Sequence, residues 1–221
     1  GQDRDGPEHG GLSKFGEDVV REMNKLGMMI DVSHISDEAF YDVLKISNAP
    51  VIASHSSARA LYNHPRNMDD QMLRALAEKD GVIQVCMVGE YLKVLPPYPE
   101  RDSAQQEVRR EYGNFYKLPP DEREAFLEAW FAVDSIFPPK MAAVSDFADH
   151  IDHIVEIAGI DHVGIGTDFD GGGELEGCYD VSEMENITHE LLKRGYSRNE
   201  IQKIWSGNLM RVLRKVEKSA G

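Results

Sequence analysis

Residues that can bind a divalent metal stand at or next to the ends of three short apolar segments. The segments MMIDVSH, PVIASHS and HVGIGTDFD carry His34, His55 and the pair Asp168 and Asp170, respectively. Neutral imidazole and carboxylate groups are ligands that suit Zn²⁺ or a related divalent ion. On adjacent strands, which lie about 5 Å apart, two imidazoles can converge on one or two metals. Spacing alone leaves two interpretations open, metal ligands or polar strand-end residues with protein partners.

These segments belong to an alternating pattern of short apolar runs and amphipathic helices. Strands are expected near residues 28–33, 50–55, 81–87 and 162–167. Nearly continuous apolar runs separated by helices are typical of a parallel sheet covered on its outer side. A complete (β/α)8 TIM barrel has eight such units in about 250 residues, and its active site lies at the carboxyl ends of the strands. The sequence therefore predicts an α/β fold of about four strand–helix units, half of a barrel.

The helix boundaries are marked by capping residues. In LSKFGEDVVREMNKLG, apolar residues recur at helical spacing, with Ser13 as the expected N-cap and Gly27 as the expected C-cap. Ser36 is expected to cap the next helix in the same way.

Composition excludes several classes of partner. The chain has 221 residues, with 24 Lys and Arg against 39 Asp and Glu, so its net charge is −15. Such acidity argues against a nucleic-acid partner and against an anionic membrane surface. No apolar run is long enough for a transmembrane helix, and the polar start GQDRDGPEHGG is not a signal peptide. Cys86 and Cys178, the only cysteines, are expected to be free thiols and not a thiolate zinc site.

One segment departs from the pattern. Residues 90–139 are charged, rich in proline and aromatic residues, and carry signs of short helices. We expect residues 1–221 to form a single domain with an irregular insertion at about 90–139, which serves as a lid or an oligomer contact.

Four motifs in a fixed order carry a resemblance to a known family. IDVSH, ASHSS, HPRN and GIGTDFDG follow one another between Gly11 and Val216, and the similarity weakens only at 92–140. Together they make the chain similar to the membrane dipeptidase (renal dipeptidase) family of zinc metallopeptidases, whose fold is an amidohydrolase-like (β/α)8 barrel.

The resemblance implies a role for each candidate residue. His34 and His55 would be ligands of the same zinc ion in a site that holds two zinc ions when complete. Arg66, in HPRN, would bind the carboxylate of a dipeptide substrate, a task that suits a guanidinium fork. Asp168 would be catalytic, facing the substrate amino group and the reacting water, with Asp170 the weaker candidate. Tyr91 would line the substrate pocket.

The family pattern also demands groups that this chain does not carry. A His-x-Asp pair on the first strand, a bridging glutamate and a further substrate-binding histidine all precede the aligned region. His150-Ile-Asp152 imitates the first pair, but it lies in an amphipathic helix and is expected to form a solvated helix face. His9 and His64 are expected to be polar loop residues. The chain is therefore expected to supply only part of the metal site, with an N-terminal half missing or supplied by another chain, or to form a homo-oligomer.

The function predicted from the sequence is zinc-dependent hydrolysis of dipeptides. The alternatives are another amidohydrolase-type reaction on a carboxylate-bearing amide or lactone, or a non-catalytic half-barrel module. A cytoplasmic location is favoured, and any targeting segment would precede this chain.

Overall fold

A computed structural model describes residues 8–220 of the chain. The polar start considered above lies largely outside the described residues. The chain forms two compact units, of which the first contains Gly1–Val94 and Ala142–Gly221 and the second contains Leu95–Met141. The second unit coincides closely with the segment that the sequence sets apart at 90–139.

The strands and helices follow the expected alternation. The strands are β1 (Ile52–Ser56), β2 (Val82–Cys86) and β3 (Val163–Gly166). The helices of the first unit are α1 (Lys14–Leu26), α2 (Asp37–Ile46), α3 (Asp70–Glu78), α4 (Gly89–Leu92), α7 (Val144–Ala158), α8 (Glu185–Lys193), α9 (Arg198–Gln202) and α10 (Asn208–Ser219). Short 3₁₀ turns cover Ile160–His162, Phe169–Gly171 and Val181–Glu183, and a π-helical turn covers Lys203–Gly207.

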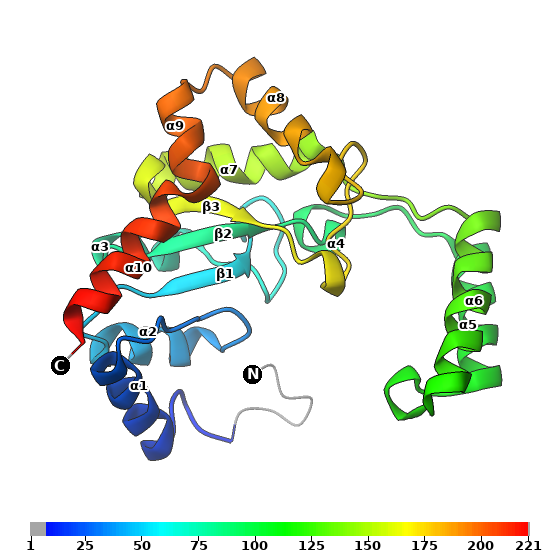
Figure 1. The fold of residues 1–221 in the computed structure, drawn as a ribbon, viewed down its shortest axis with the longest axis horizontal. Coiled ribbons are helices and arrows are strands. Elements are labelled where there is room, and N and C mark those ends of the chain that lie inside the picture. Colours follow the sequence, from blue (N-terminus) through cyan, green and yellow to red (C-terminus); the bar gives the residue numbers. More distant parts are fainter. Residues whose placement is uncertain (1–7, 221) are drawn as a thin grey trace. The chain divides into compact units, whose positions relative to one another are not determined.

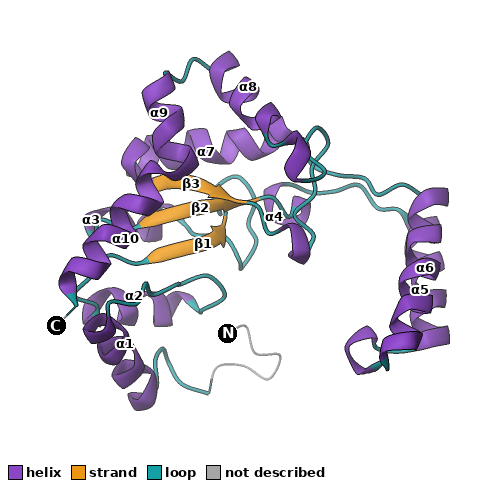
Figure 2. Ribbon diagram, in the orientation of Figure 1, coloured by secondary structure: helices purple, strands orange, loops and turns teal. Residues whose placement is uncertain are grey.

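The three strands form one parallel sheet in the order β1-β2-β3 (Figure 2). Figure 1 shows α1 and α2 on the β1 side of the sheet and α7, α8 and α9 on the β3 side. Helix α10 crosses the amino-terminal ends of the strands, where Val212 and Val216 pack against Ile52 and Val82. The opposite, carboxyl ends of the strands remain available for functional side chains.

The predicted strand at 28–33 is not a full strand, so the expectation of four regular strands was wrong. The segment begins to pair with β1 in parallel, because Ile52 N donates to Ile30 O at 2.9 Å and Val32 N donates to Ile52 O at 2.8 Å. The ladder then stops, since the next amide, Ser54 N, donates to the side chain of Asp31 at 3.0 Å. A carboxylate thus takes a hydrogen bond that a backbone carbonyl would accept in a regular sheet.

The helix caps are those that the sequence predicts. Ser13 Oγ accepts a hydrogen bond from Gly16 N, and Ser36 Oγ accepts one from Ala39 N. Gly27 ends α1 with φ = 68°, a left-handed conformation that favours glycine.

His150 is buried in α7, so the expected solvated helix face was wrong for this residue. Its Nδ1 accepts a hydrogen bond from Ala58 N at 2.9 Å, and its Nε2 bonds to Leu92 O at 2.9 Å. Asp152 pairs with Arg194 at 2.5 Å instead of joining His150. The His-x-Asp sequence in this helix is therefore a structural element.

The second unit is more regular than the sequence suggests. It contains α5 (Pro99–Tyr112), a 3₁₀ turn at Phe115–Lys117 and α6 (Pro120–Ile136). Its own small core is formed by Val108, Leu118, Phe126 and Val133. Arg101 bonds to Asp134 at 2.7 Å, which ties the two long helices together.

Candidate metal and substrate site

The two histidines singled out in the sequence meet in the structure. His34 follows the segment that pairs with β1, and His55 lies near the carboxyl end of β1. Their Nε2 atoms are 2.6 Å apart, and their ring centroids are 4.7 Å apart. Two imidazoles from neighbouring segments therefore direct the same ring nitrogen at one point in space.

The pair needs only a small opening to share a zinc ion. Zn–N bonds of about 2.0–2.1 Å in a tetrahedral site place two ligand nitrogens roughly 3.3 Å apart. Slight rotation of either ring can provide this spacing, because side-chain torsions are soft within their wells. The donor set thus fits zinc, although it accounts for only two of its ligands.

His34 and Asp168 both adopt left-handed backbone conformations. Their φ angles are 69° and 59°, and Asp80 is the only other non-glycine residue with positive φ within residues 8–220. Such conformations are uncommon for residues with a Cβ and concentrate at functional sites. Two of the predicted site residues are therefore held in backbone geometry that the surrounding structure must impose.

A serine and an aspartate stand behind His55. Ser54 Oγ lies 2.8 Å from His55 Nδ1 and 2.5 Å from Asp31 Oδ2. The other carboxylate oxygen of Asp31 accepts hydrogen bonds from Ser33 N at 2.9 Å and Ser54 N at 3.0 Å. The His55 ring is therefore held by hydrogen bonds on the side away from His34.

Arg66 lies beside the histidine pair, in the loop that follows β1. Its side chain donates to His55 O at 3.3 Å and lies over the ring of Tyr91, with the guanidinium carbon 5.4 Å from the ring centre. The residue is only 8% exposed. No carboxylate within residues 8–220 forms an ion pair with it, and its buried Nε has no hydrogen-bond partner there. A buried cation without an anion is costly, which marks this guanidinium as a candidate anion-binding group.

Asn67 holds the Arg66 loop against the segment that carries Tyr91. Its Nδ2 donates to Tyr62 O at 2.9 Å and to Tyr91 O at 2.7 Å. His64, predicted to be a polar loop residue, packs its ring 4.6 Å from that of Tyr91 and accepts a hydrogen bond from Arg66 N at 3.2 Å. Arg66, Tyr91 and His64 thus form one packed group.

Asp168 follows β3 and is enclosed by its own loop. Its backbone carbonyl accepts hydrogen bonds from Gly171 N at 2.9 Å and Gly173 N at 2.8 Å. The thiol of Cys86, at the carboxyl end of β2, lies 3.8 Å from the Asp168 carboxylate. Asp170 is exposed in the same loop. The geometry therefore favours Asp168 over Asp170 as the residue directed toward the sheet end.

The surroundings of His34 favour its neutral form. Burial, the Arg66 charge and the neighbouring His55 lower the pKa of His34, and Asp168 and Asp31 partly offset this effect. Burial, followed by Arg66, also lowers the pKa of His64. Neutral imidazole is the form that binds metal ions. Burial raises the pKa of Cys86 to about 12, so its thiol stays protonated and can donate to Asp168.

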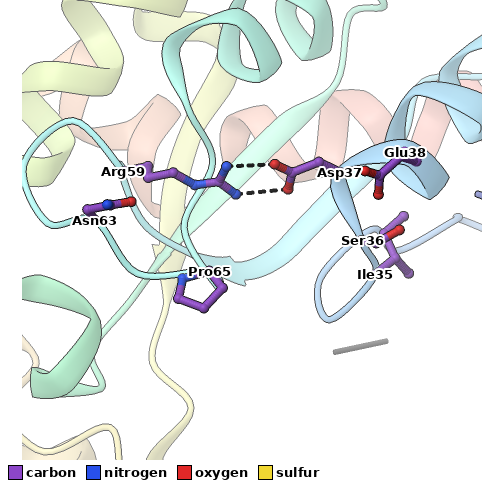
Figure 3. A pocket seen from close by; sticks show the side chains of 7 residues that line it. All are labelled: Ile35, Ser36, Asp37, Glu38, Arg59, Asn63 and Pro65. Atoms are coloured by element: carbon purple, nitrogen blue, oxygen red, sulfur yellow. Dashed lines mark hydrogen bonds and ion pairs between the residues drawn. The ribbon is translucent and has the colours of Figure 1, made fainter. Parts of the chain in front are cut away.

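A cavity of about 460 Å³ opens next to these residues without containing the histidine rings. Figure 3 shows its lining side chains, which are Ile35, Ser36, Asp37, Glu38, Arg59, Asn63 and Pro65. Arg59 forms a two-pronged ion pair with Asp37 at 2.6 and 2.8 Å, so its charge is already compensated. A narrower cleft beside it is lined by His34, Arg59 and Arg66. Because Arg66 has no ion-pair partner among residues 8–220, it is this cation, and not Arg59, that is available to a ligand.

The structure thus brings His34, His55, Arg66 and Tyr91 together, and Asp168 is close enough to alter the pKa of His34. Within the described residues, no group of three or more His, Cys, Asp or Glu side chains is arranged to hold a metal ion. Sequence reasoning missed Asp31, Ser54, Asn67 and Cys86 as parts of the site. The one available signal was Asp31, an acidic residue inside the apolar run MMIDVSH.

Comparisons with known proteins identify the family of the chain. The sequence matches the family described as membrane dipeptidase (peptidase family M19) over residues 1–221, and the chain belongs to this family. The dipeptidase tcpJ of Claviceps purpurea (strain 20.1) is 36% identical over 212 residues, which are 96% of this chain and 40% of that protein. Dipeptidase 3 of Mus musculus is 36% identical over 208 residues, which are 94% of this chain and 33% of that protein.

Solved structures show the same relationship. The crystal structure of the probable dipeptidase PvdM from Pseudomonas aeruginosa has a TM-score of 0.75 and 36% identity, covering 96% of this chain and 56% of that one. A metallopeptidase from Rhodobacter sphaeroides, liganded with a phosphinate mimic of the dipeptide L-Ala-D-Ala, has a TM-score of 0.71 and 25% identity, covering 94% and 48%. The chain therefore spans roughly half the length of these solved relatives and 33–40% of the curated ones.

Among the described residues, no helix combines the length and apolar character needed to cross a membrane.

Proposed function

We propose that this chain forms part of a zinc-dependent dipeptidase and supplies two metal ligands together with the substrate-binding arginine. The observation that carries the proposal is the convergence of His34 and His55, with Nε2 atoms 2.6 Å apart, beside Arg66, which is buried and has no ion-pair partner in the described part of the chain. Membership of the membrane dipeptidase family supports it independently.

His34 and His55 would hold zinc through their Nε2 atoms. When bound, zinc supplies Lewis acidity, which lowers the pKa of a coordinated water and polarises the scissile carbonyl. The chain's own contribution is to favour the neutral form of His34, whose pKa is lowered, and to orient His55 through the hydrogen bond at its Nδ1.

Arg66 would bind the carboxylate at the C-terminus of a dipeptide. Its charge has no ion-pair partner within residues 8–220, and contact with His55 O and Tyr91 fixes its position. A carboxylate would provide the missing partner for the guanidinium. Tyr91 would form an apolar wall of the pocket at this end of the substrate.

Asp168 would bind the free amino group and hold a proton on its carboxylate during cleavage. The Cys86 thiol and the tight glycine loop position this side chain. Ammonium recognition by Asp168 and carboxylate recognition by Arg66 would together fit two residues, because a longer peptide would leave one of these charges unpaired.

The remaining ligands of a site with two zinc ions would come from outside this chain. The parallel sheet and its preceding segment fit the C-terminal half of a (β/α)8 barrel, with the rest of the barrel completing both the sheet and the metal site. This agrees with the partial coverage of the relatives and with the lack of a third metal ligand among the described residues. A homo-oligomer in which a second chain completes the site is the alternative assembly.

The test is metal analysis together with hydrolysis of a dipeptide panel by the protein produced from the whole gene. We expect bound zinc and hydrolysis of free dipeptides, with little activity on N-acyl amino acids that lack the ammonium group. Comparable rates on both substrate types would favour a different amidohydrolase-type reaction. If a double variant with His34→Ala and His55→Ala keeps both its zinc and its activity, the assignment of the metal ligands is overturned.

A further inference from the structure

The hydrogen bonds behind His55 form a chain of three side chains with a fixed direction. Asp31 Oδ2 and Ser54 Oγ are 2.5 Å apart, and Ser54 Oγ and His55 Nδ1 are 2.8 Å apart. Asp31 Oδ1 is occupied separately, because it accepts from the backbone amides of Ser33 and Ser54. The Asp31 carboxylate is therefore oriented by the backbone before it contacts the serine.

The Asp31 carboxylate, at one end of this series of hydrogen bonds, determines which atom donates in each of them. An ionised carboxylate can only accept, so the single hydroxyl proton of Ser54 must point to Asp31. Ser54 Oγ then offers only lone pairs to His55, and His55 Nδ1 must carry the proton that bridges them. In a neutral imidazole the other nitrogen, Nε2, then keeps its lone pair.

We propose that Asp31 and Ser54 are positioning residues that fix His55 in the Nδ1–H tautomer, so that Nε2 presents its lone pair at the point shared with His34. Partners of this kind orient metal-binding histidines and affect metal affinity. The inference rests on the proposed zinc site for its purpose, but the tautomer itself exists and can be measured without any metal.

The geometry predicts that one conservative substitution reverses the direction of the hydrogen bonds that link residue 31, Ser54 and His55. In Asp31→Asn, the remaining carbonyl oxygen can still accept from the two backbone amides that Asp31 Oδ1 serves. The new NH₂ group then faces Ser54 Oγ and donates to it. Ser54 must turn its hydroxyl proton toward His55 Nδ1, which moves the histidine proton to Nε2 and removes the lone pair from the metal position.

Ser56 provides the matched control. It lies on the same strand, and its hydroxyl is 3.2 Å from Ser33 Oγ. No hydrogen bond joins its side chain to the His55 ring in the described structure. Ser56→Ala therefore removes the same chemical group at the same strand end and leaves the Asp31–Ser54–His55 chain intact.

The experiment records long-range ¹H–¹⁵N spectra of the histidine rings in the full, metal-free chain at about pH 8, where imidazole is neutral. We expect His55 to carry its proton on Nδ1 in the parent chain and in Ser56→Ala, on Nε2 in Asp31→Asn, and on a mixture of both in Ser54→Ala. Ser54→Thr, which keeps the hydroxyl, should restore the parent pattern. An Nε2–H tautomer in the parent chain would overturn the proposal, and so would an unchanged tautomer in Asp31→Asn.

A zinc titration of the protein produced from the whole gene, with the same substitutions and followed by the same signals, adds a second readout. Asp31→Asn and Ser54→Ala should weaken zinc binding at least about tenfold, and Ser56→Ala should not. Equal affinity in the parent, Asp31→Asn, Ser54→Ala and Ser56→Ala would contradict the positioning role. If the parent shows the expected tautomer but the protein from the whole gene binds no zinc, the proposed zinc site fails and the hydrogen-bond assignment stands. The parent spectrum decides the tautomer even if a variant fails to fold.

Discussion

At the scale of single residues, a comparison of Arg66 with Arg59 distinguishes a candidate substrate-binding arginine from a structural one. It is a buried cation without an ion-pair partner in the described chain, whereas Arg59, in the same loop, is fully engaged with Asp37. A buried cation that stabilises the fold is paired with an anion of the protein, whereas a cation that binds a ligand has no such partner until the ligand arrives.

Replacing Arg66 should therefore impair binding of the substrate carboxylate. Hydrogen bonds to charged groups contribute about 1.5–3 kcal/mol, so Arg66→Met should raise KM for a free dipeptide by roughly 10- to 100-fold. The check is steady-state kinetics on a dipeptide and on its C-terminal amide. The parent protein should prefer the free acid, and Arg66→Met should treat both substrates nearly alike.

Arg59→Met is the control for this prediction. It breaks the ion pair with Asp37 and should lower stability, yet it should keep the preference for the free acid. A variant lacking Arg66 that still discriminates acid from amide as strongly as the parent would show that another group binds the carboxylate.

At this scale the candidate site residues were easier to predict from the sequence than the residues that hold them in place. His34, His55 and Asp168 stand at strand ends, where side-chain chemistry is readable from the pattern alone. Asp31 and Ser54 act through hydrogen bonds whose partners are fixed only by the register between two segments, and register is a tertiary property. The same holds for His150, whose helical position was predictable but whose burial depends on the packing of α7 against Ala58 and Leu92.

At the scale of elements, the loop after β3 is built around contacts that only glycine permits. A Cβ on Gly173 would lie 1.9 Å from Thr167 O and 2.7 Å from Asp168 O, both of which are backbone atoms. The backbone must therefore shift if any side chain is introduced there, and it carries Asp168 with it.

Gly173→Ala should lower the free energy of unfolding by about 1–3 kcal/mol, as overpacking typically does. It should also reduce kcat, because the Asp168 carboxylate leaves its position. Urea denaturation and kinetics check both effects. Gly10→Ala is the control, since a Cβ there meets nothing within 4 Å. Equal stability of the two variants would contradict the steric argument.

Helix α7 should make stability depend on pH through His150. Burial is the largest cause of its lowered pKa, and the hydrogen bond to Leu92 O opposes it only in part. Since the folded pKa lies below the ordinary value near 6.5, the unfolded state binds more protons at low pH. The contribution of His150 is therefore fully present above about pH 6.5 and is lost as the pH falls toward the folded pKa.

Urea denaturation between about pH 7.5 and 5 tests this expectation, with a slope from one group of at most about 1.4 kcal/mol per pH unit. His150→Gln should flatten the pH dependence, and substitution of the exposed His189 on α8 by Gln should leave it unchanged. A parent profile that stays level across this range would refute the role assigned to His150.

The strand prediction at 28–33 shows where element-scale reasoning stops. Its apolar run was read correctly as pairing with β1, because Ile30 and Val32 make the two expected ladder bonds. The point at which this pairing ends was not predictable. Ser54 N donates to the Asp31 carboxylate and not to a backbone carbonyl, and this choice depends on side-chain geometry. The strands β1, β2 and β3 appear close to where the periodicity placed them.

At the scale of the whole molecule, the two units have separate cores. Val108, Leu118, Phe126 and Val133 pack within Leu95–Met141, and the large core around the sheet is built from residues outside that segment. Where the chain leaves and re-enters the first unit, Lys93 bonds to Asp146 at 2.7 Å. The two connection points are therefore already held close together without the second unit.

We expect the first unit to fold when Leu95–Met141 is replaced by an eight-residue Gly/Ser linker, which can span about 26 Å. Because no residue of the core around the sheet is lost, the free energy of unfolding of the first unit should change by less than about 1 kcal/mol, equivalent to a shift in Tm of about 2–4 °C. Calorimetry and the ring signals of His34 and His55 check this result. In the parent chain, Phe126→Ala should destabilise the second core by about 3–5 kcal/mol and leave the same histidine signals unchanged. A linker variant without a cooperative transition, or with altered histidine signals, would instead mean that the first unit depends on α5 and α6 for its structure.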